Sequence, residues 1–114
     1  MKFYRNFDQG EGALGLRQIR DLEKKPLKRK LYKNRHGYIL VLFMDSKEQV
    51  EIYTMREYLL RKLYLREGYI LASRLTLREC QDYVFELAKA TYRENGSLYI
   101  KSYILNQEHT KEAL

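Results

Sequence analysis

YILVLFM, residues 38–44, is the longest apolar run in this chain of 114 residues. A strand with apolar side chains on both faces is expected at the centre of a sheet that is covered on both sides. Residues 45–48 (DSKE) then supply a turn, and residues 49–54 alternate apolar Val50 and Ile52 with polar neighbours, as in the second strand of a hairpin. The sequence therefore predicts a sheet built around residues 38–44.

Helices are expected before and after this hairpin, where apolar residues recur at spacings of three and four. They cover residues 16–25, 54–67 and 76–95. The first must end before Pro26, which cannot continue a helix. The other two begin with the spacing of a capping box, because Thr54 and Thr76 are each followed three residues later by a glutamate. In the third helix Cys80 falls on the apolar face, which predicts a buried structural thiol.

Four further strands complete the predicted sheet. They cover residues 2–7 and 28–33, both at sheet edges, and residues 69–73 and 98–105. The last strand would place Leu98, Ile100 and Ile104 on one face and Tyr99, Lys101 and Tyr103 on the other. Residues 107–114 are expected to form a polar tail.

The resulting order, β-α-β-β-β-α-β-α-β, predicts an α+β fold in a single domain that covers residues 1–114. We expect a small mixed or antiparallel sheet with two to three helices. A small curled barrel, PUA-like or similar, would suit the same order by analogy at the level of the fold alone.

The excess positive charge of the chain is concentrated in one stretch. Residues 17–35 contain nine Lys and Arg and two acidic residues, a net charge of +7, whereas 13 basic and 13 acidic residues balance in the rest of the sequence. Such a stretch repels itself and is stabilised by solvent or by an anionic partner. We call residues 17–35 the basic block.

Nucleic acid is the anionic partner that fits best, because each cation that contacts a phosphate releases condensed counterions. RNA is favoured over DNA, since the charge lies on a short helix and a strand without a helix-turn-helix pattern. The expected phosphate contacts are Arg17, Arg20, Lys24, Lys28, Arg29, Lys30, Lys33 and Arg35. Bases can stack on tyrosine rings, and the candidates for this role are Tyr32, Tyr99 and Tyr103, with Lys101 beside the last two. The sequence thus predicts a small, non-enzymatic RNA-binding regulator.

Two other functions remain open. A small basic endoribonuclease would use His36 or Tyr32 as its acid and base, with the cations of the basic block around them. An interaction or inhibitor module would instead dock the basic block on an acidic protein. The exposed edge strand or the tyrosine-rich face could also pair two copies of the chain into a homodimer.

Other chemistries are not expected. Gly10, Gly12 and Gly15 have the spacing of a dinucleotide-binding loop, but the strand before them is charged and the basic block stands where that motif needs an acidic residue. One cysteine and two histidines without ligand spacing predict no metal site, and no cofactor is expected. The single cysteine fits a reducing compartment, so we expect a cytoplasmic protein. An apolar run of seven residues is too short to cross a membrane.

Overall fold

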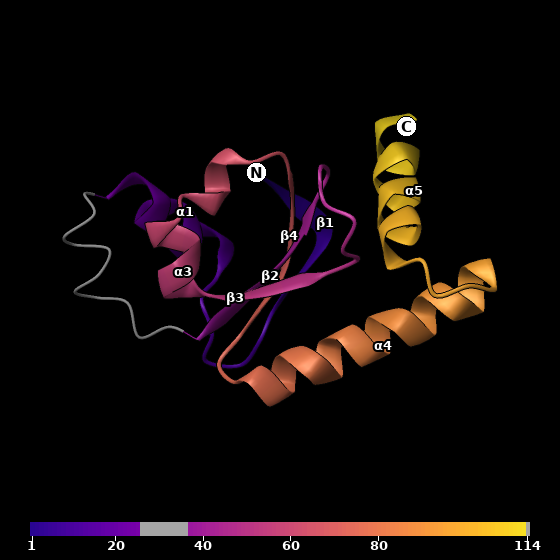
Figure 1. Cartoon of the computed structure of the whole chain (residues 1–114), viewed down its shortest axis with the longest axis horizontal. Coiled ribbons are helices and arrows are strands. Elements are labelled where there is room, and N and C mark those ends of the chain that lie inside the picture. Colours follow the sequence, from indigo (N-terminus) through magenta and orange to yellow (C-terminus); the bar gives the residue numbers. More distant parts are fainter. Residues whose placement is uncertain (26–36, 114) are drawn as a thin grey trace.

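The structure is a computed structural model that describes residues 1–25 and 37–113. Its strands form one open sheet in the order β1-β4-β2-β3, with helices on both faces (Figure 1). The strands are β1 (Lys2–Gln9), β2 (Tyr38–Phe43), β3 (Glu51–Thr54) and β4 (Gly68–Arg74). The helices are α1 (Leu16–Lys24), α3 (Met55–Leu60), the 3₁₀ turn η1 (Leu63–Leu65), α4 (Leu77–Asn95) and α5 (Ile100–Ala113). The α+β fold with a mixed sheet is confirmed, whereas the curled barrel is not formed.

The apolar strand β2 occupies the centre of the sheet, as its sequence predicts. It pairs antiparallel with β3 on one side and with β4 on the other. All five residues from Ile39 to Phe43 are 0% exposed. The hairpin of β2 and β3 and the short strand β4 were expected, and so was the edge position of β1, which pairs only with β4, in parallel. The strand predicted at residues 28–33 lies outside the described residues.

Alternation along β2 divides the core into two parts. Ile39, Val41 and Phe43 face a layer formed by α1, α3 and η1, where they meet Ile19 and Tyr58. We call this the α1–α3 layer.

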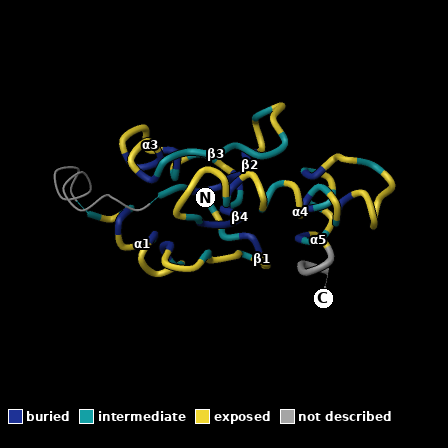
Figure 2. The backbone as a smooth tube through the Cα atoms, turned by 90° about the horizontal axis from the view of Figure 1, so that it is seen from below, coloured by how far each residue is buried: buried dark blue, intermediate teal, exposed yellow. Residues whose placement is uncertain are grey.

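The other side chains of β2, Leu40 and Leu42, face α4 and α5. There they pack with Cys80, Leu87 and Ile104, and we call this the α4–α5 layer. Figure 2 shows α1 and α3 at one end of the molecule and α4 and α5 at the other, with the strands between them. The sheet therefore separates two helical layers.

The strand predicted at residues 98–105 is wrong, because this segment begins the helix α5, which continues through most of the predicted polar tail to Ala113. Ile100 and Ile104 are both buried. Their spacing of four puts them on one face of either a strand or a helix, so the pattern alone does not separate the two. Contacts from β1 fix the helix: the hydroxyl of Tyr4 donates to Oε1 of Gln107, and the amide of Arg5 donates to Oε1 of Glu108 at 2.8 Å. With α5 the described residues contain four α-helices, whereas two to three helices were expected.

At both predicted capping boxes the threonine caps the N-terminus of its helix, as expected. The hydroxyl of Thr54 accepts from the amide of Glu57 at 3.0 Å, and that of Thr76 accepts from the amide of Glu79 at 3.2 Å. The helix that begins after Thr54 is shorter than predicted. Lys62 has a φ of 50°, in the left-handed region, so α3 ends and η1 begins beyond it.

Gly37 fixes the point at which the chain enters β2. Its φ is +69°, and a β-carbon there would overlap the carbonyl oxygen of Arg74 and lie 2.8 Å from Cα of Leu75. Only glycine fits both constraints. The carbonyl of Gly37 accepts from the amide of Met55 at 3.0 Å, so residue 37 lies beside the start of α3.

Replacement of Ile104 tests the packing of α5 on the sheet. Ile104 is 0% exposed, so Ile104→Ala should lower the free energy of unfolding by about 2–5 kcal/mol. The exposed Ser102 on the same helix gives a matched control, and Ser102→Ala should change that free energy by less than about 0.5 kcal/mol. Urea denaturation followed by circular dichroism measures both. Equal stability of the two variants would show that α5 does not pack as described.

Candidate nucleic-acid interface

The helix α1 turns one face to the core and the opposite face to solvent. Ile19 and Leu22 are buried, whereas Arg17 and Lys24 are exposed. The helix begins at Gly15, whose amide donates to the side-chain oxygen of Gln18 at 2.8 Å. Two of the predicted phosphate contacts, Arg17 and Lys24, therefore lie on an ordered helix with their cations in solvent.

Arg20, a third predicted contact on α1, is engaged within the protein. Its guanidinium donates to Oε1 of Glu23 at 2.8 Å and to the carbonyl of Met1 at 2.7 Å, and it lies 4.5 Å from the ring centre of Phe3. The side chain is 33% exposed. These contacts give Arg20 a structural role in joining α1 to β1.

Glu23 extends this network to α3. Its second oxygen accepts from the hydroxyl of Tyr58 at 2.6 Å. Burial, reinforced by the Glu23 carboxylate, raises the pKa of Tyr58 far above its usual range, so the phenol stays protonated and keeps donating. The chain Arg20–Glu23–Tyr58 thus holds α1 against α3.

The position of α3 adds cations that the sequence analysis missed. Arg56, Arg61 and Lys62 are exposed. Arg61 has a loose ion pair with Glu57 at 3.8 Å, with both side chains more than half exposed, and such pairs are readily exchanged. In contrast Arg66 is tied to Asp45 at 2.7 Å, and this guanidinium holds the pKa of the Asp45 carboxyl below its usual value. We call the exposed cations of α1, of α3 and of the turn that follows α3 the cationic face: Arg17, Lys24, Arg56, Arg61 and Lys62.

The rest of the predicted site lies outside the described residues. It comprises Lys28, Arg29, Lys30, Tyr32, Lys33, Arg35 and His36. The two flanking residues are described: Lys25 follows α1, and Gly37 accepts a hydrogen bond from Met55, the first residue of α3. The described chain therefore stops at the end of α1 and resumes beside the start of α3.

Charge is distributed unequally between the two helical layers. Residues 16–25 and 55–67, which include the α1–α3 layer, contain eight Lys and Arg and four acidic residues, a net charge of +4. Residues 77–113, which include α4 and α5, contain five basic and six acidic residues, a net charge of −1. The segment 26–36 adds five cations without an acidic residue. The excess charge of the protein is thus in the α1–α3 layer and in residues 26–36, which follow α1 in the sequence.

The predicted stripe of Tyr99, Lys101 and Tyr103 is not formed, because these residues lie at and just before the start of α5 instead of along a strand. The ammonium of Lys101 donates to the carbonyls of Met44 and Ser46, at 3.1 and 2.8 Å, and so closes the connection between β2 and β3. Tyr99 is exposed and Tyr103 is partly buried. All three belong to the α4–α5 layer, so the fold does not join them to the cationic face.

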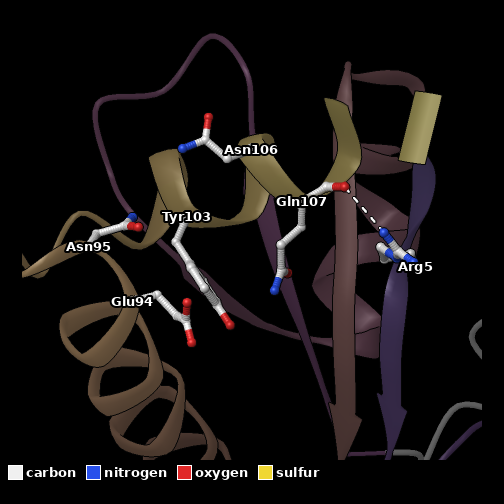
Figure 3. A pocket seen from close by; sticks show the side chains of 6 residues that line it. All are labelled: Arg5, Glu94, Asn95, Tyr103, Asn106 and Gln107. Carbon is white, nitrogen blue, oxygen red and sulfur yellow. Dashed lines mark hydrogen bonds between the residues drawn. The ribbon is translucent and has the colours of Figure 1, made fainter. Parts of the chain in front are cut away.

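A polar pocket of about 420 Å³ lies between β1, the end of α4 and α5 (Figure 3). Its lining residues are Arg5, Glu94, Asn95, Tyr103, Asn106 and Gln107. Tyr103 points toward Glu94, and Arg5 donates to the carbonyl of Gln107 at 3.4 Å. With one cation and one carboxylate the pocket is balanced in charge, so it is not an extension of the cationic face.

Within residues 1–25 and 37–113, no group of three or more His, Cys, Asp or Glu could hold a metal ion. None of the helices in this part of the chain is long and apolar enough to cross a membrane. No protein-family model, curated protein or solved structure matches the chain. Its function must therefore be inferred from the geometry and charge described above.

Cys80 provides a test of how the α4–α5 layer is packed. The side chain is 0% exposed, and burial raises the pKa of the thiol to about 11. At neutral pH only about one thiol in 10⁴ would be the reactive thiolate. In the folded protein an aromatic disulfide reagent should therefore label Cys80 no faster than the chain unfolds, whereas labelling in urea should be complete within minutes. Rapid labelling of the folded protein would show that this thiol is accessible and potentially nucleophilic.

Proposed function

We propose that the protein binds RNA, without cleaving it, through the cationic face and the adjoining residues 26–36. The observation that supports this proposal best is the one-sided distribution of charge, +4 against −1 for the two helical layers. A one-sided field attracts a polyanion and orients it toward one side of the protein.

The exposed cations of α1 and α3 suit contacts with a phosphate backbone. Arg17 and Lys24 lie on α1, Arg56 lies on α3 and Arg61 caps its C-terminus. The Arg20–Glu23–Tyr58 network fixes the two helices relative to each other. Because the two helices are already fixed, binding of a phosphate restricts mainly the rotamers of the cationic side chains themselves. Backbone contacts alone give affinity without reading sequence.

RNA is favoured over duplex DNA by the shape of this surface. α1 has nine residues and α3 has six, and each uses its apolar face to cover the sheet. Side chains on such helices can contact the sugar–phosphate backbone of a nucleic acid that passes over them. A recognition helix must instead project far enough to enter the major groove of DNA. Recognition of RNA relies more on backbone shape and on single-stranded segments.

Removal of exposed cations in matched pairs tests this proposal. The double variant Arg17→Gln, Lys24→Gln should weaken binding of labelled oligouridine several-fold at physiological salt. It should also lower the slope of log affinity against log salt by about 1.4, or 0.7 for each lost phosphate contact. The control Lys47→Gln, Arg78→Gln removes the same charge from exposed positions in the β2–β3 turn and on α4, and its affinity should stay within twofold of the parent. Fluorescence anisotropy at several salt concentrations measures both.

Other outcomes would replace this proposal. Equal weakening by both double variants would mean that net charge, and not the cationic face, governs binding. RNA that is shortened by the parent but not by His36→Ala would favour the endoribonuclease. Failure to bind RNA, together with capture of an acidic protein that survives nuclease treatment, would favour the interaction module.

A further inference from the structure

The helix α4 has a second apolar stripe that faces solvent. Phe85 is 62% exposed and Tyr92 is 61% exposed, and Leu98 just beyond the helix is 63% exposed. With Ala88 they line a groove of about 780 Å³. The buried residues of α4, which are Cys80, Leu87 and Thr91, lie about a third of a turn around the helix from Phe85 and Tyr92. Ala88 lies between the two sets and is partly buried against the α4–α5 layer. Figure 1 shows the C-terminal part of α4 running beyond the strands, where the sheet no longer covers it.

This stripe is a continuous feature and not a set of scattered residues. Phe85, Ala88 and Tyr92 are spaced by three and four, so they lie on one face of the helix. A single exposed apolar residue is common on protein surfaces. Exposed aromatic rings grouped on one face of a helix are typical of interaction surfaces.

The charges beside the stripe are divided along the helix. Asp82 and Glu86 lie toward the N-terminus, and Lys89 and Arg93 lie toward the C-terminus. All four are exposed, and helical spacing places them along the same edge of the stripe. One half of this edge is therefore negative and the other half is positive.

We propose that this surface binds a second copy of the chain, with the two α4 helices packed antiparallel about a twofold axis near Ala88. Phe85 and Tyr92 are equally distant in sequence from the midpoint of Ala88 and Lys89. A twofold axis at that midpoint therefore sets Phe85 against the partner's Tyr92, twice. Ala88 lies at the crossing point, where its small side chain lets the helices approach closely.

The same axis pairs the charged halves of the two edges. It brings Asp82 opposite the partner's Arg93 and Glu86 opposite the partner's Lys89, each within about 3 Å of rise along the helix. In a parallel twofold arrangement this edge would instead face the opposite edge of the partner helix, and these charge pairs would not form. Lys89 is within 3.0 Å of Glu86 of its own helix, and this exposed pair can exchange partners at little cost.

The size of the surface defines the strength of the dimer. Two exposed rings and one leucine per copy make a small interface, which is expected to give weak association that depends on concentration. The α1–α3 layer lies across the sheet from α4 and stays free in such a dimer. The inference does not rest on RNA binding.

Analytical ultracentrifugation of residues 1–114 over a range of concentrations tests the dimer. The average mass of the parent should rise toward twice the monomer mass, whereas Phe85→Ser, Tyr92→Ser should stay monomeric with an unchanged helical circular dichroism spectrum. Both side chains are exposed, so the fold should tolerate their loss. A parent that stays monomeric at every concentration, or a dimer that survives this double variant, would overturn the proposal.

Charge reversal tests the pairing without removing apolar side chains. Asp82→Lys, Glu86→Lys makes the whole edge positive, and Lys89→Glu, Arg93→Glu makes it negative. Each variant alone should be monomeric because like charges then meet, and a mixture of the two should form a heterodimer. Self-association of either variant equal to that of the parent, or no heterodimer in the mixture, would contradict the twofold arrangement.

Discussion

The complete burial of β2 on both faces is the constraint on which the rest of the structure depends. Side chains from Ile39 to Phe43 alternate between the two sides of the sheet and are 0% exposed. Burial of each such side chain contributes about 1.5–3 kcal/mol relative to an exposed position, but only if another apolar layer covers it. The strand therefore requires two helical layers, and the chain supplies them from different regions of the sequence. Division into two layers is what allows charge to collect on one side of the molecule.

Most of the fold could be predicted from local patterns in the sequence. β2, its hairpin partner β3 and the long helix α4 have periodicities that fit one kind of element, and the caps at Thr54 and Thr76 depend on residues three positions away. The start of α5 could not be assigned in this way, because Ile100 and Ile104 fit both periods. Contacts with Tyr4 and Arg5, about 100 positions distant in sequence, decide that this segment is a helix.

The candidate site could also be predicted only in part. Runs of charge are visible in the sequence. The fold, however, is what brings the exposed cations of α3 beside those of α1. The contacts that hold Arg20 depend on the carbonyl of Met1 and the ring of Phe3, which are distant from it in sequence.

The two layers differ in what their outer surfaces offer. The α1–α3 layer is cationic and is held together by a partly buried polar network, whereas the α4–α5 layer is close to neutral and exposes aromatic rings. Because the sheet lies between them, a partner on one layer does not compete for the other. RNA binding and self-association, as proposed above, could therefore operate together, and a dimer would carry two cationic faces. Two linked faces would raise the apparent affinity for a long RNA without any new contact.

The central claim is that the polyanion binds one layer and not the other. Titration of the isotope-labelled protein with oligouridine, followed by the chemical shifts of its backbone amides in nuclear magnetic resonance spectra, locates the contact directly. The account predicts that shifts change in α1, in α3 and in residues 26–36, while the amides of α4 and α5 keep their positions. Changes concentrated in residues 77–113, or no change at any RNA concentration, would contradict it.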